Sequence, residues 1–269
     1  MEKIVRSLLC LIAAAALCSC GPRLVILHTN DTHSHFDPLR SGDRSGHGGV
    51  IERAAFIDSV RSRHGDGKVL LLHAGDWNQG SSYYSELGGS LELDVINAMR
   101  YDAVALGNHE FDNGIENLQE RLSKLDVPVV CANLDLSPFE LGSLVKPYVI
   151  IQKGRMKVGV IGLEADLTTC VSKTISSRIR QLDPVEVTLK WADFLKNEQK
   201  CNLVILLSHQ GYKEDHAIAS AVRNVDLIIG GHSHTFVEDF DYVEDLDGCR
   251  VPIVTDGCWG LEMGEITIR

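Results

Sequence analysis

Short apolar runs that end in polar residues recur along this chain, and they limit the possible folds more than any other feature of the sequence. Residues 24–27, 69–72 and 203–207 are such runs, and none of them alternates between apolar and polar positions. A strand with one solvated face would show a period of two, so these strands are predicted to be buried on both faces. Stretches with helical spacing separate the runs. We therefore predict an α/β fold in which the sheet is covered on both faces, with helices outside.

The same patterns define the order of the elements. Strands are predicted at residues 24–27, 69–72, 103–106, 127–130, 203–207, 226–229, 251–255 and 263–268, and helices at residues 50–60, 91–99, 115–125 and 185–196. The runs at 145–151 and 156–163 flank a turn-forming stretch and predict a β-hairpin. Pro184 is suited to the first position of the last helix. Nothing in the middle of the chain resembles a linker, so we predict a single domain.

The composition supports a globular protein and excludes some partners. Of the 269 residues, 44% are hydrophobic and 23% are charged, which is enough apolar material for a sizeable core. The net charge of −11 and the lack of a basic stripe argue against a nucleic-acid polymer as a partner. A small phosphorylated substrate stays compatible with this charge, because bound divalent ions can dominate the field within a cleft.

The first residues have the pattern of a secretory signal. Lys3 and Arg6 precede an apolar stretch from Leu8 to Leu17 that is too short to span a bilayer. The following Cys20 suggests a lipoprotein signal peptide over residues 1–19, with Cys20 acylated, although an ordinary signal with a chance cysteine is the alternative. We therefore expect an exported protein of the bacterial cell envelope, held at the membrane only by a lipid anchor and facing the periplasm. Residues 20–269 would form the folded domain.

The cysteines outside the signal do not form a metal-binding pattern. They have no C-x-x-C spacing, which argues against a thiolate zinc site or a redox pair. Cys249 and Cys258 flank a strand-like run and are candidates for a disulfide in an oxidising compartment. Cys131 and Cys201 adjoin strand-like runs and are expected to be core thiols. The full set is Cys131, Cys170, Cys201, Cys249 and Cys258.

Polar side chains that can bind metal ions follow five of the predicted strands. They are Asp31 and His33, Asp76, Asn108 and His109, His209, and His232 and His234. Each motif alone also fits an ordinary turn or a hydrogen-bonded histidine. Their joint occurrence is more informative, because the carboxyl ends of strands form the edge of an open α/β sheet where ligands bind. The donors are nitrogen and oxygen only, which suits Zn, Mn, Fe, Co or Ni.

Three of these motifs have a more specific interpretation. Asp31-Thr32-His33 and His232-Ser233-His234 each place two ligand-type residues at i and i+2, which extended backbone would point in the same direction. The stretch from Gly107 to Asp112 interrupts an apolar run with Asn, His and two acids. We predict that Asn108 binds a metal ion while His109 faces a substrate.

Taken in order, these motifs resemble the calcineurin-like metallophosphoesterase superfamily. More narrowly, residues 27–33, 107–114 and 257–268 are similar to the N-terminal catalytic domain of the 5′-nucleotidase family. The resemblance implies a four-layer α/β/β/α sandwich with a site for two divalent metal ions. It assigns Asp31, His33 and His234 to one ion, Asn108, His209 and His232 to the other, and Asp76 to a bridging position. It also implies that His109 is the catalytic histidine, that Asp112 is its partner, and that Asn108 and His109 contact the substrate.

The resemblance implies metal-dependent hydrolysis of phosphate esters, with nucleotides as the expected substrates and a bridging hydroxide as the nucleophile. Two alternatives stay open: a thiosulfate-ester hydrolase of the same superfamily, and a non-catalytic surface or partner-binding protein that retains the fold. Full-length 5′-nucleotidases carry a C-terminal domain that recognises the nucleotide, and this chain stops where that domain would begin. We expect either that a separate polypeptide supplies recognition or that the domain acts alone.

Some neighbours of these motifs have no assigned role. His28 and His35 flank the first motif and either support its ligands or make ordinary loop hydrogen bonds. Trp77, Tyr83 and Tyr84 follow Asp76 and either stack on a substrate or pack locally. Glu110 is left without a catalytic role.

Overall fold

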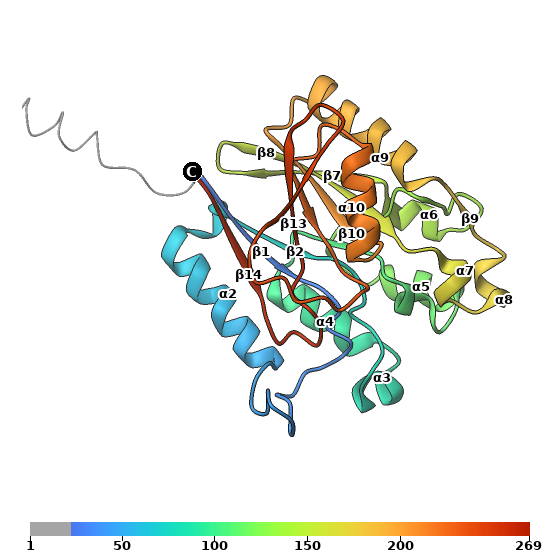
Figure 1. Ribbon diagram of the computed structural model, residues 1–269. Coiled ribbons are helices and arrows are strands. Elements are labelled where there is room, and N and C mark those ends of the chain that lie inside the picture. Colours follow the sequence, from blue (N-terminus) through green and yellow to red (C-terminus); the bar gives the residue numbers. More distant parts are fainter. Residues whose placement is uncertain (1–22) are drawn as a thin grey trace, which may run out of the picture.

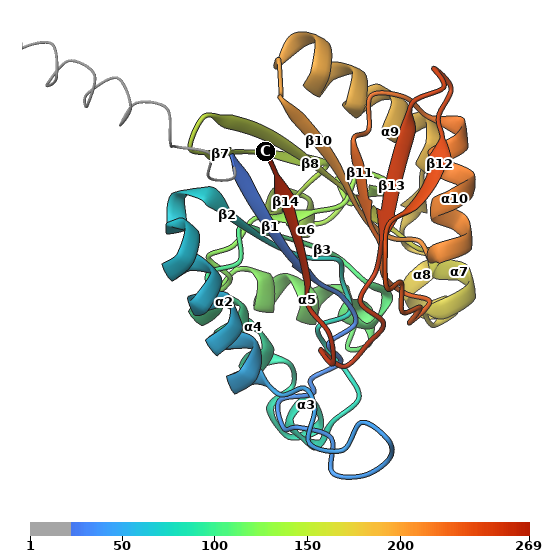
Figure 2. The same ribbon diagram turned by 60° about the vertical axis from the view of Figure 1, so that its left-hand side comes forward.

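Two β-sheets packed face to face form the centre of the molecule, with helices on both outer faces (Figures 1 and 2). The computed structural model describes residues 23–269. The predicted signal peptide (residues 1–19) and Cys20 lie outside these residues. Within residues 23–269, no helix is both long enough and apolar enough to cross a membrane.

The first sheet contains the early strands of the chain in the order β14-β1-β2-β3-β4-β6. All pairs in this sheet are parallel except β14 with β1. Every residue of β1 and β2 is buried, as the lack of alternation predicts, whereas the edge strand β14 alternates between intermediate and exposed residues. Their bounds are β1 (Leu24–Thr29), β2 (Val69–His73), β3 (Ala103–Ala105), β4 (Val129–Val130), β6 (Val145–Lys146) and β14 (Gly264–Ile268).

The second sheet follows the order β12-β13-β11-β10-β8-β7, with antiparallel strands at its two edges. The predicted hairpin is confirmed as β7 and β8, which pair from Tyr148 opposite Ile161 to Lys153 opposite Met156. Residues 145 and 146 do not belong to it, because they pair with β4 in the first sheet. The bounds are β7 (Tyr148–Lys153), β8 (Met156–Glu164), β10 (Leu203–His209), β11 (Leu227–Ile229), β12 (Asp241–Glu244) and β13 (Arg250–Val254). A small separate sheet pairs β5 (Leu134–Asp135) with β9 (Arg180–Gln181).

The helices divide between the two outer faces of the sandwich. The first sheet is covered by α2 (Val50–His64), α4 (Ser90–Met99) and α5 (Ile115–Leu122), and the second by α9 (Pro184–Asp193) and α10 (Tyr212–Ala221). Pro184 occupies the first turn of α9 as predicted, and the side chain of Asp183 caps that helix by accepting from two backbone N–H groups. The shorter helices are α3 (Ser82–Leu87), α6 (Leu141–Leu144), α7 (Leu167–Cys170) and α8 (Lys173–Ser176), and α9 continues as a π-helical turn over Phe194–Glu198.

Three hydrophobic cores follow from this layering. Successive residues of a strand point to opposite faces, so Val25 and Leu27 of β1 pack toward the helices while Leu24 and Ile26 pack between the sheets. The third core lies between the second sheet and its helices. The four-layer α/β/β/α arrangement is therefore confirmed. The plainer prediction of one sheet with helices on both faces is incomplete, because the inner face of each sheet packs on the other sheet.

The candidate disulfide between Cys249 and Cys258 is not formed in this structure. All five cysteines within the described residues are free thiols. Cys249 precedes β13 and Cys258 follows it, so the extended strand holds the two residues apart. Cys131 and Cys201 are buried, as predicted.

Candidate metal centre

The loops that follow β1, β2, β3, β10 and β11 meet at one end of the sandwich and bring the predicted ligands together. Three overlapping groups of side chains are arranged so that they could hold a metal ion. Within each group, the ligand atoms lie within 4.8 Å of one another. The groups are Asp31, His33 and His234; His33, Asp76 and His109; and Asp76, His209 and His232. Because they share His33 and Asp76, the three groups form one continuous cluster.

The individual contacts show how closely the side chains are packed. Nε2 of His33 lies 2.9 Å from Nε2 of His234, and Nε2 of His234 lies 3.3 Å from Oδ1 of Asp31. On the other side of the cluster, Nδ1 of His232 lies 2.9 Å from Oδ1 of Asn108. Asn108 therefore joins the cluster through its amide oxygen, as predicted from its position after β3.

Left-handed backbone places many of these side chains. Asp31, His33, Asp76, His232 and His234 all have positive φ, between 46° and 70°. The prediction that extended backbone aligns the i and i+2 pairs is therefore wrong. Each strand ends before its motif, and tight turns aim the side chains inward instead. Such conformations are unfavourable for residues other than glycine and are found where the surrounding structure enforces them, often at functional sites.

Asp76 occupies the middle of the cluster. Its Oδ2 lies 3.1 Å from Nε2 of His209 and 3.9 Å from Nε2 of His33, while its Oδ1 accepts a hydrogen bond of 2.9 Å from the backbone N–H of His109. Burial alone would raise the pKa of the Asp76 carboxyl, but the imidazole of His209 holds that pKa well below its usual range. An ionised carboxylate between two groups of imidazoles is suited to bridging cations.

The histidines are oriented as metal ligands usually are. Nδ1 of His209 donates to the carbonyl of Ala74 at 2.7 Å, and Nδ1 of His33 donates to the carbonyl of Asn78 at 3.2 Å. In the neutral form of each ring, these bonds leave Nε2 as an acceptor that faces the cluster. Nε2 of His209 is buried and makes no hydrogen bond within the described chain. A cation at this position would give that atom the partner it lacks.

The charges of the cluster favour cations as well. Hydrogen bonds to Asp31 and Cys258 raise the pKa of His234 to about 10, and the bond to Asp31 has the larger effect. Burial lowers the pKa of His209, but the carboxylates of Asp76 and Asp31 outweigh it and raise the pKa well above its usual value. The two carboxylates thus draw positive charge onto neighbouring imidazoles. An all-nitrogen and oxygen donor set with this charge fits divalent metal ions.

His109 and Asp112 lie at the accessible side of the cluster. Nδ1 of His109 lies 2.8 Å from Oδ2 of Asp112, and the two side chains are 30% and 31% exposed. This hydrogen bond is the main cause of a raised pKa at His109. The His109 ring lies 5.3 Å from the ring of His33, centroid to centroid. The imidazole is therefore both next to the cluster and open to a ligand from solvent.

Glu110 has a structural role that the sequence analysis did not assign. Its carboxylate is buried and accepts backbone N–H groups from Asp76 at 2.9 Å, Gly107 at 2.6 Å and Asn78 at 3.2 Å. It thereby ties the Asp76 turn to the turn that carries Asn108. The spacing Gly-x-x-Glu at a helical start was the available signal, because the Glu side chain can accept from the first backbone N–H, as in one half of a capping box.

Asn30 also holds a ligand, although only its position before Asp31 suggested this. Its Nδ2 donates to Oδ2 of Asp31 at 2.7 Å and to the carbonyl of Gly257 at 2.6 Å, and its Oδ1 accepts from the backbone of Asp256 at 2.8 Å. Asn30 therefore fixes Asp31 relative to the loop after β13.

The remaining candidates lie around the cluster in different ways. Nδ1 of His35 donates to the carbonyl of His33 at 2.9 Å, and its ring stacks on Trp259 at 5.1 Å. His28 instead pairs with Asp256 and lines another cavity. Trp77 is 2% exposed and packs in the core, so it offers no face to a substrate.

Tyr83 and Tyr84 also make local contacts. Tyr83 packs edge to face on Phe36, and the Tyr84 hydroxyl accepts a hydrogen bond from Asn113 at 2.8 Å.

Comparisons with known proteins agree with this geometry. Residues 24–236 match the family described as Calcineurin-like phosphoesterase. The chain is 36% identical to a snake venom 5′-nucleotidase of Naja atra over 91% of its length, and 33% identical to the 5′-nucleotidase of Homo sapiens, also over 91%. It superimposes on the crystal structure of a 5′-nucleotidase precursor from Thermus thermophilus with a TM-score of 0.83 and 34% identity over 90% of the chain.

The match covers only part of each relative. The chain spans about half the length of these proteins: 50% of the Naja atra protein, 46% of the human protein and 50% of the Thermus thermophilus chain. The similarity therefore concerns the part of each relative that corresponds to the sandwich and its strand-end cluster.

Proposed function

The chain belongs to the calcineurin-like phosphoesterase family, and we propose that its strand-end cluster binds two divalent metal ions and hydrolyses phosphate esters, with nucleotides as the preferred substrates. The observation that carries this proposal is the overlap of three ligand groups through His33 and Asp76, in which His109 is partly open to solvent. The names of the relatives, which are 5′-nucleotidases, support nucleotides as the substrate class.

The proposed ligands form two sets that share Asp76. They are Asp31, His33 and His234 for one ion, and Asn108, His209 and His232 for the other. Two ions bound here would activate a water molecule and neutralise charge on the phosphoryl oxygens during an in-line displacement. The nitrogen and oxygen donors of both sets are compatible with Zn, Mn, Fe, Co or Ni.

His109 would act on the substrate directly. Its Nδ1 is held by Asp112, which leaves Nε2 as the atom that can reach a phosphate. With its pKa raised, the imidazole carries a proton more readily and can donate a hydrogen bond to a phosphoryl oxygen or protonate the leaving oxygen. The backbone N–H of His109 bonds to Asp76 and fixes the position of the ring relative to the cluster.

The test is metal-dependent phosphate release by the purified protein. The panel should contain nucleoside 5′-monophosphates, cyclic nucleotides, nucleotide sugars and simple phosphomonoesters, each with Mn²⁺ or Zn²⁺ added and with a chelator. We expect hydrolysis to require metal, to be lost in Asp76→Asn and to be preserved in His64→Ala, which changes a histidine at the end of α2. A folded, metal-loaded protein that cleaves no ester in the panel would contradict the proposal.

We propose that nucleotide recognition involves a recognition domain in addition to the sandwich. The support is that each relative is about twice as long as the region it shares with this chain. The measurement is kcat/KM for the four nucleoside monophosphates relative to a simple phosphomonoester. Weak preference among the bases by the protein alone agrees with this proposal, and a strong preference for one base contradicts it.

We also propose that the protein is exported and lipid-anchored at Cys20 in the periplasm. The support is the basic start, the short apolar stretch and the cysteine that follows it. In cells, the wild-type protein should fractionate with membranes and incorporate labelled fatty acid, and Cys20→Ala should do neither. Equal labelling of both proteins would argue for attachment elsewhere.

A further inference from the structure

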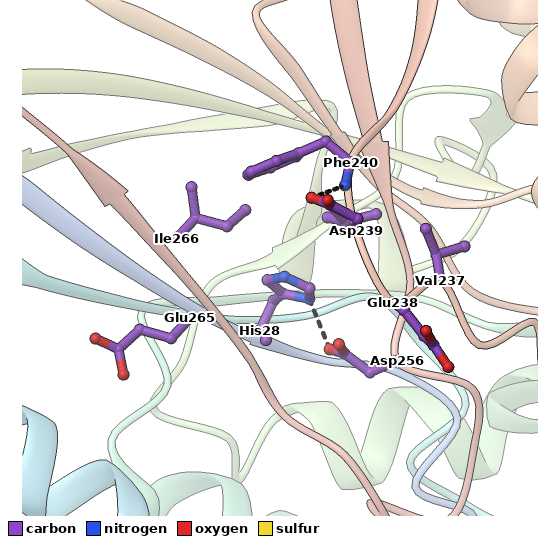
Figure 3. A pocket seen from close by; sticks show the side chains of 10 residues that line it. His28, Val237, Glu238, Asp239, Phe240, Asp256, Glu265 and Ile266 are labelled. Carbon is purple, nitrogen blue, oxygen red and sulfur yellow. Dashed lines mark hydrogen bonds and ion pairs between the residues drawn. The ribbon is translucent and has the colours of Figure 1, made fainter.

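A second cavity lies at the open edge of the sandwich, separate from the metal cluster. It has a volume of about 240 Å³ and lies between β1 and β14 of the first sheet and the segments around β13 of the second. Figure 3 shows its lining side chains, with His28 at the centre. No role follows for this cavity from the proposed phosphoesterase chemistry.

The lining consists of hydrogen-bond acceptors and apolar groups. It includes four carboxylates and the imidazole of His28, but no lysine, arginine, hydroxyl or amide side chain. In Figure 3, Glu238 and Glu265 point away from the imidazole, while Asp239 and Asp256 lie on either side of it. One oxygen of Asp239 accepts from the backbone N–H of Phe240 at 2.8 Å, which leaves its other oxygen free for a ligand. The cavity therefore favours a ligand group that donates hydrogen bonds.

His28 is a buried polar side chain that the protein does not fully satisfy. It is 2% exposed, and its Nδ1 lies 2.6 Å from Oδ2 of Asp256. The other ring nitrogen is turned toward Asp239 and Phe240 (Figure 3). With the proton of the imidazole on Nδ1, facing Asp256, Nε2 is a bare acceptor.

The neighbouring backbone makes room for the imidazole. A Cβ added at Gly264 would lie 2.0 Å from Nε2 of His28, so only glycine fits there. The ring is therefore held in place by close packing against β14, with its acceptor already in position for a ligand.

A metal ion does not fit this cavity. Within the described residues, the side-chain groups compact enough to hold an ion are those of the strand-end cluster, and none of them includes His28, Asp239 or Asp256. Because the acceptors around the cavity do not form a compact ligand group, they suit a larger cation with several N–H groups. A guanidinium has five such groups in a planar fork, whereas an ammonium is a compact point charge.

The aromatic side chains of this region also favour a guanidinium. Phe240 is 38% exposed, and its ring forms one wall of the cavity. Two guanidinium groups already stack on aromatic rings of the same segment: Arg44 lies 4.1 Å from the ring centroid of Phe236, and Arg250 lies 4.1 Å from that of Tyr242. Planar cations over aromatic faces are thus compatible with this surface.

We propose that the cavity binds a guanidinium group, which donates to Asp239, Asp256 and Nε2 of His28 and stacks on Phe240. The group belongs either to a small molecule or to an arginine side chain of a partner polypeptide, since the chemistry recognised is the same. This proposal does not rest on the phosphoesterase function, because none of these four side chains belongs to the metal cluster.

The test is calorimetric titration of the full-length folded protein with methylguanidinium, argininamide, a short peptide with one arginine, and methylammonium. We expect saturable binding of one equivalent of methylguanidinium or argininamide. Methylammonium should bind at least about tenfold more weakly, because it lacks the fork of donors. Tighter binding of the peptide than of argininamide would indicate a polypeptide partner, and the reverse would indicate a small molecule. Both results support the proposal.

Variants make the test specific. Asp239→Asn and Asp256→Asn should each weaken argininamide binding about tenfold or more, and Phe240→Leu should weaken it roughly two- to fivefold. Glu120→Gln removes the same charge from the exposed side of α5 and should have no effect. Unchanged unfolding temperatures show that the variants are folded. Absence of saturable guanidinium binding, equal binding of methylammonium, or wild-type affinity in Asp239→Asn and Asp256→Asn would overturn the proposal.

Discussion

His109 and Asp112 occupy the border between the cluster and solvent, whereas Asp31, His33, Asp76 and His209 are buried. Because the proposed ligand sets do not include His109 and its side chain hydrogen-bonds to Asp112, that side chain can be removed without removing a ligand of the proposed ions. His109→Ala should lower kcat roughly 10²- to 10⁴-fold, the usual range for a positioned acid or base. Metal content, measured by mass spectrometry, should stay that of the wild type. Loss of both metal and activity would instead make His109 a ligand.

Glu110 should affect metal affinity without touching a metal. Its carboxylate accepts three backbone N–H groups, one of them from Asp76. Glu110→Ala leaves these donors without a partner and frees the turn that carries Asp76. We expect metal affinity to fall roughly 10- to 100-fold, as for other residues that orient ligands. Glu116→Gln, an exposed change on α5, is the matched control. If the metal affinity of Glu110→Ala were unchanged, Glu110 would contribute only to the stability of the fold.

The approach of the two sheets depends on one glycine in β8. A Cβ at Gly162 would lie 2.2 Å from the carbonyl oxygen of Val130 in β4, and backbone cannot move away as a side chain can. Gly162→Ala should therefore destabilise the fold by roughly 1–3 kcal/mol, as overpacking does. Gly67→Ala is the control, because nothing lies within 4 Å of its added Cβ and its φ is not positive. The free energy of unfolding in denaturant measures both. Equal stability of the two variants would show that the sheets can separate at no cost.

The helices and strands were predictable from the sequence wherever a local property, the spacing of apolar residues, determines them. Unbroken apolar runs such as residues 24–27 and 203–207 gave the strands, and the polar residues after them marked the edge where the cluster forms. The pattern cannot tell whether a helix or a second sheet covers a strand, since both surfaces are apolar. The α/β/β/α layering came from the family resemblance and not from periodicity.

The turns and supports of the cluster were not predictable in the same way. Positive φ at Asp31 and His234 contradicts local preference and is imposed by contacts with distant segments. Glu110 bonds to residues 32 and 34 positions away, which no local pattern encodes. The meeting of the strand ends was predicted and is observed, while the metal-binding roles of these residues stay predictions.

Binding of metal to the cluster should stabilise the whole molecule, because the ligands come from five strand ends spread between Asp31 and His234. A ligand that binds only the folded chain stabilises it by about 2.7 kcal/mol at a free concentration 100 times its dissociation constant. For a chain of this size, each kcal/mol raises the unfolding temperature by roughly 2–4 °C, so saturating Mn²⁺ should raise it by about 5–10 °C over chelator-treated protein. Asp76→Asn weakens the only carboxylate shared by both proposed ions, and its shift should be much smaller. Glu120→Gln should respond like the wild type, because its charge lies on the exposed face of α5. If Mn²⁺ raised the unfolding temperature of Asp76→Asn as much as that of the wild type, the stabilising ion would be bound somewhere other than between these strand ends.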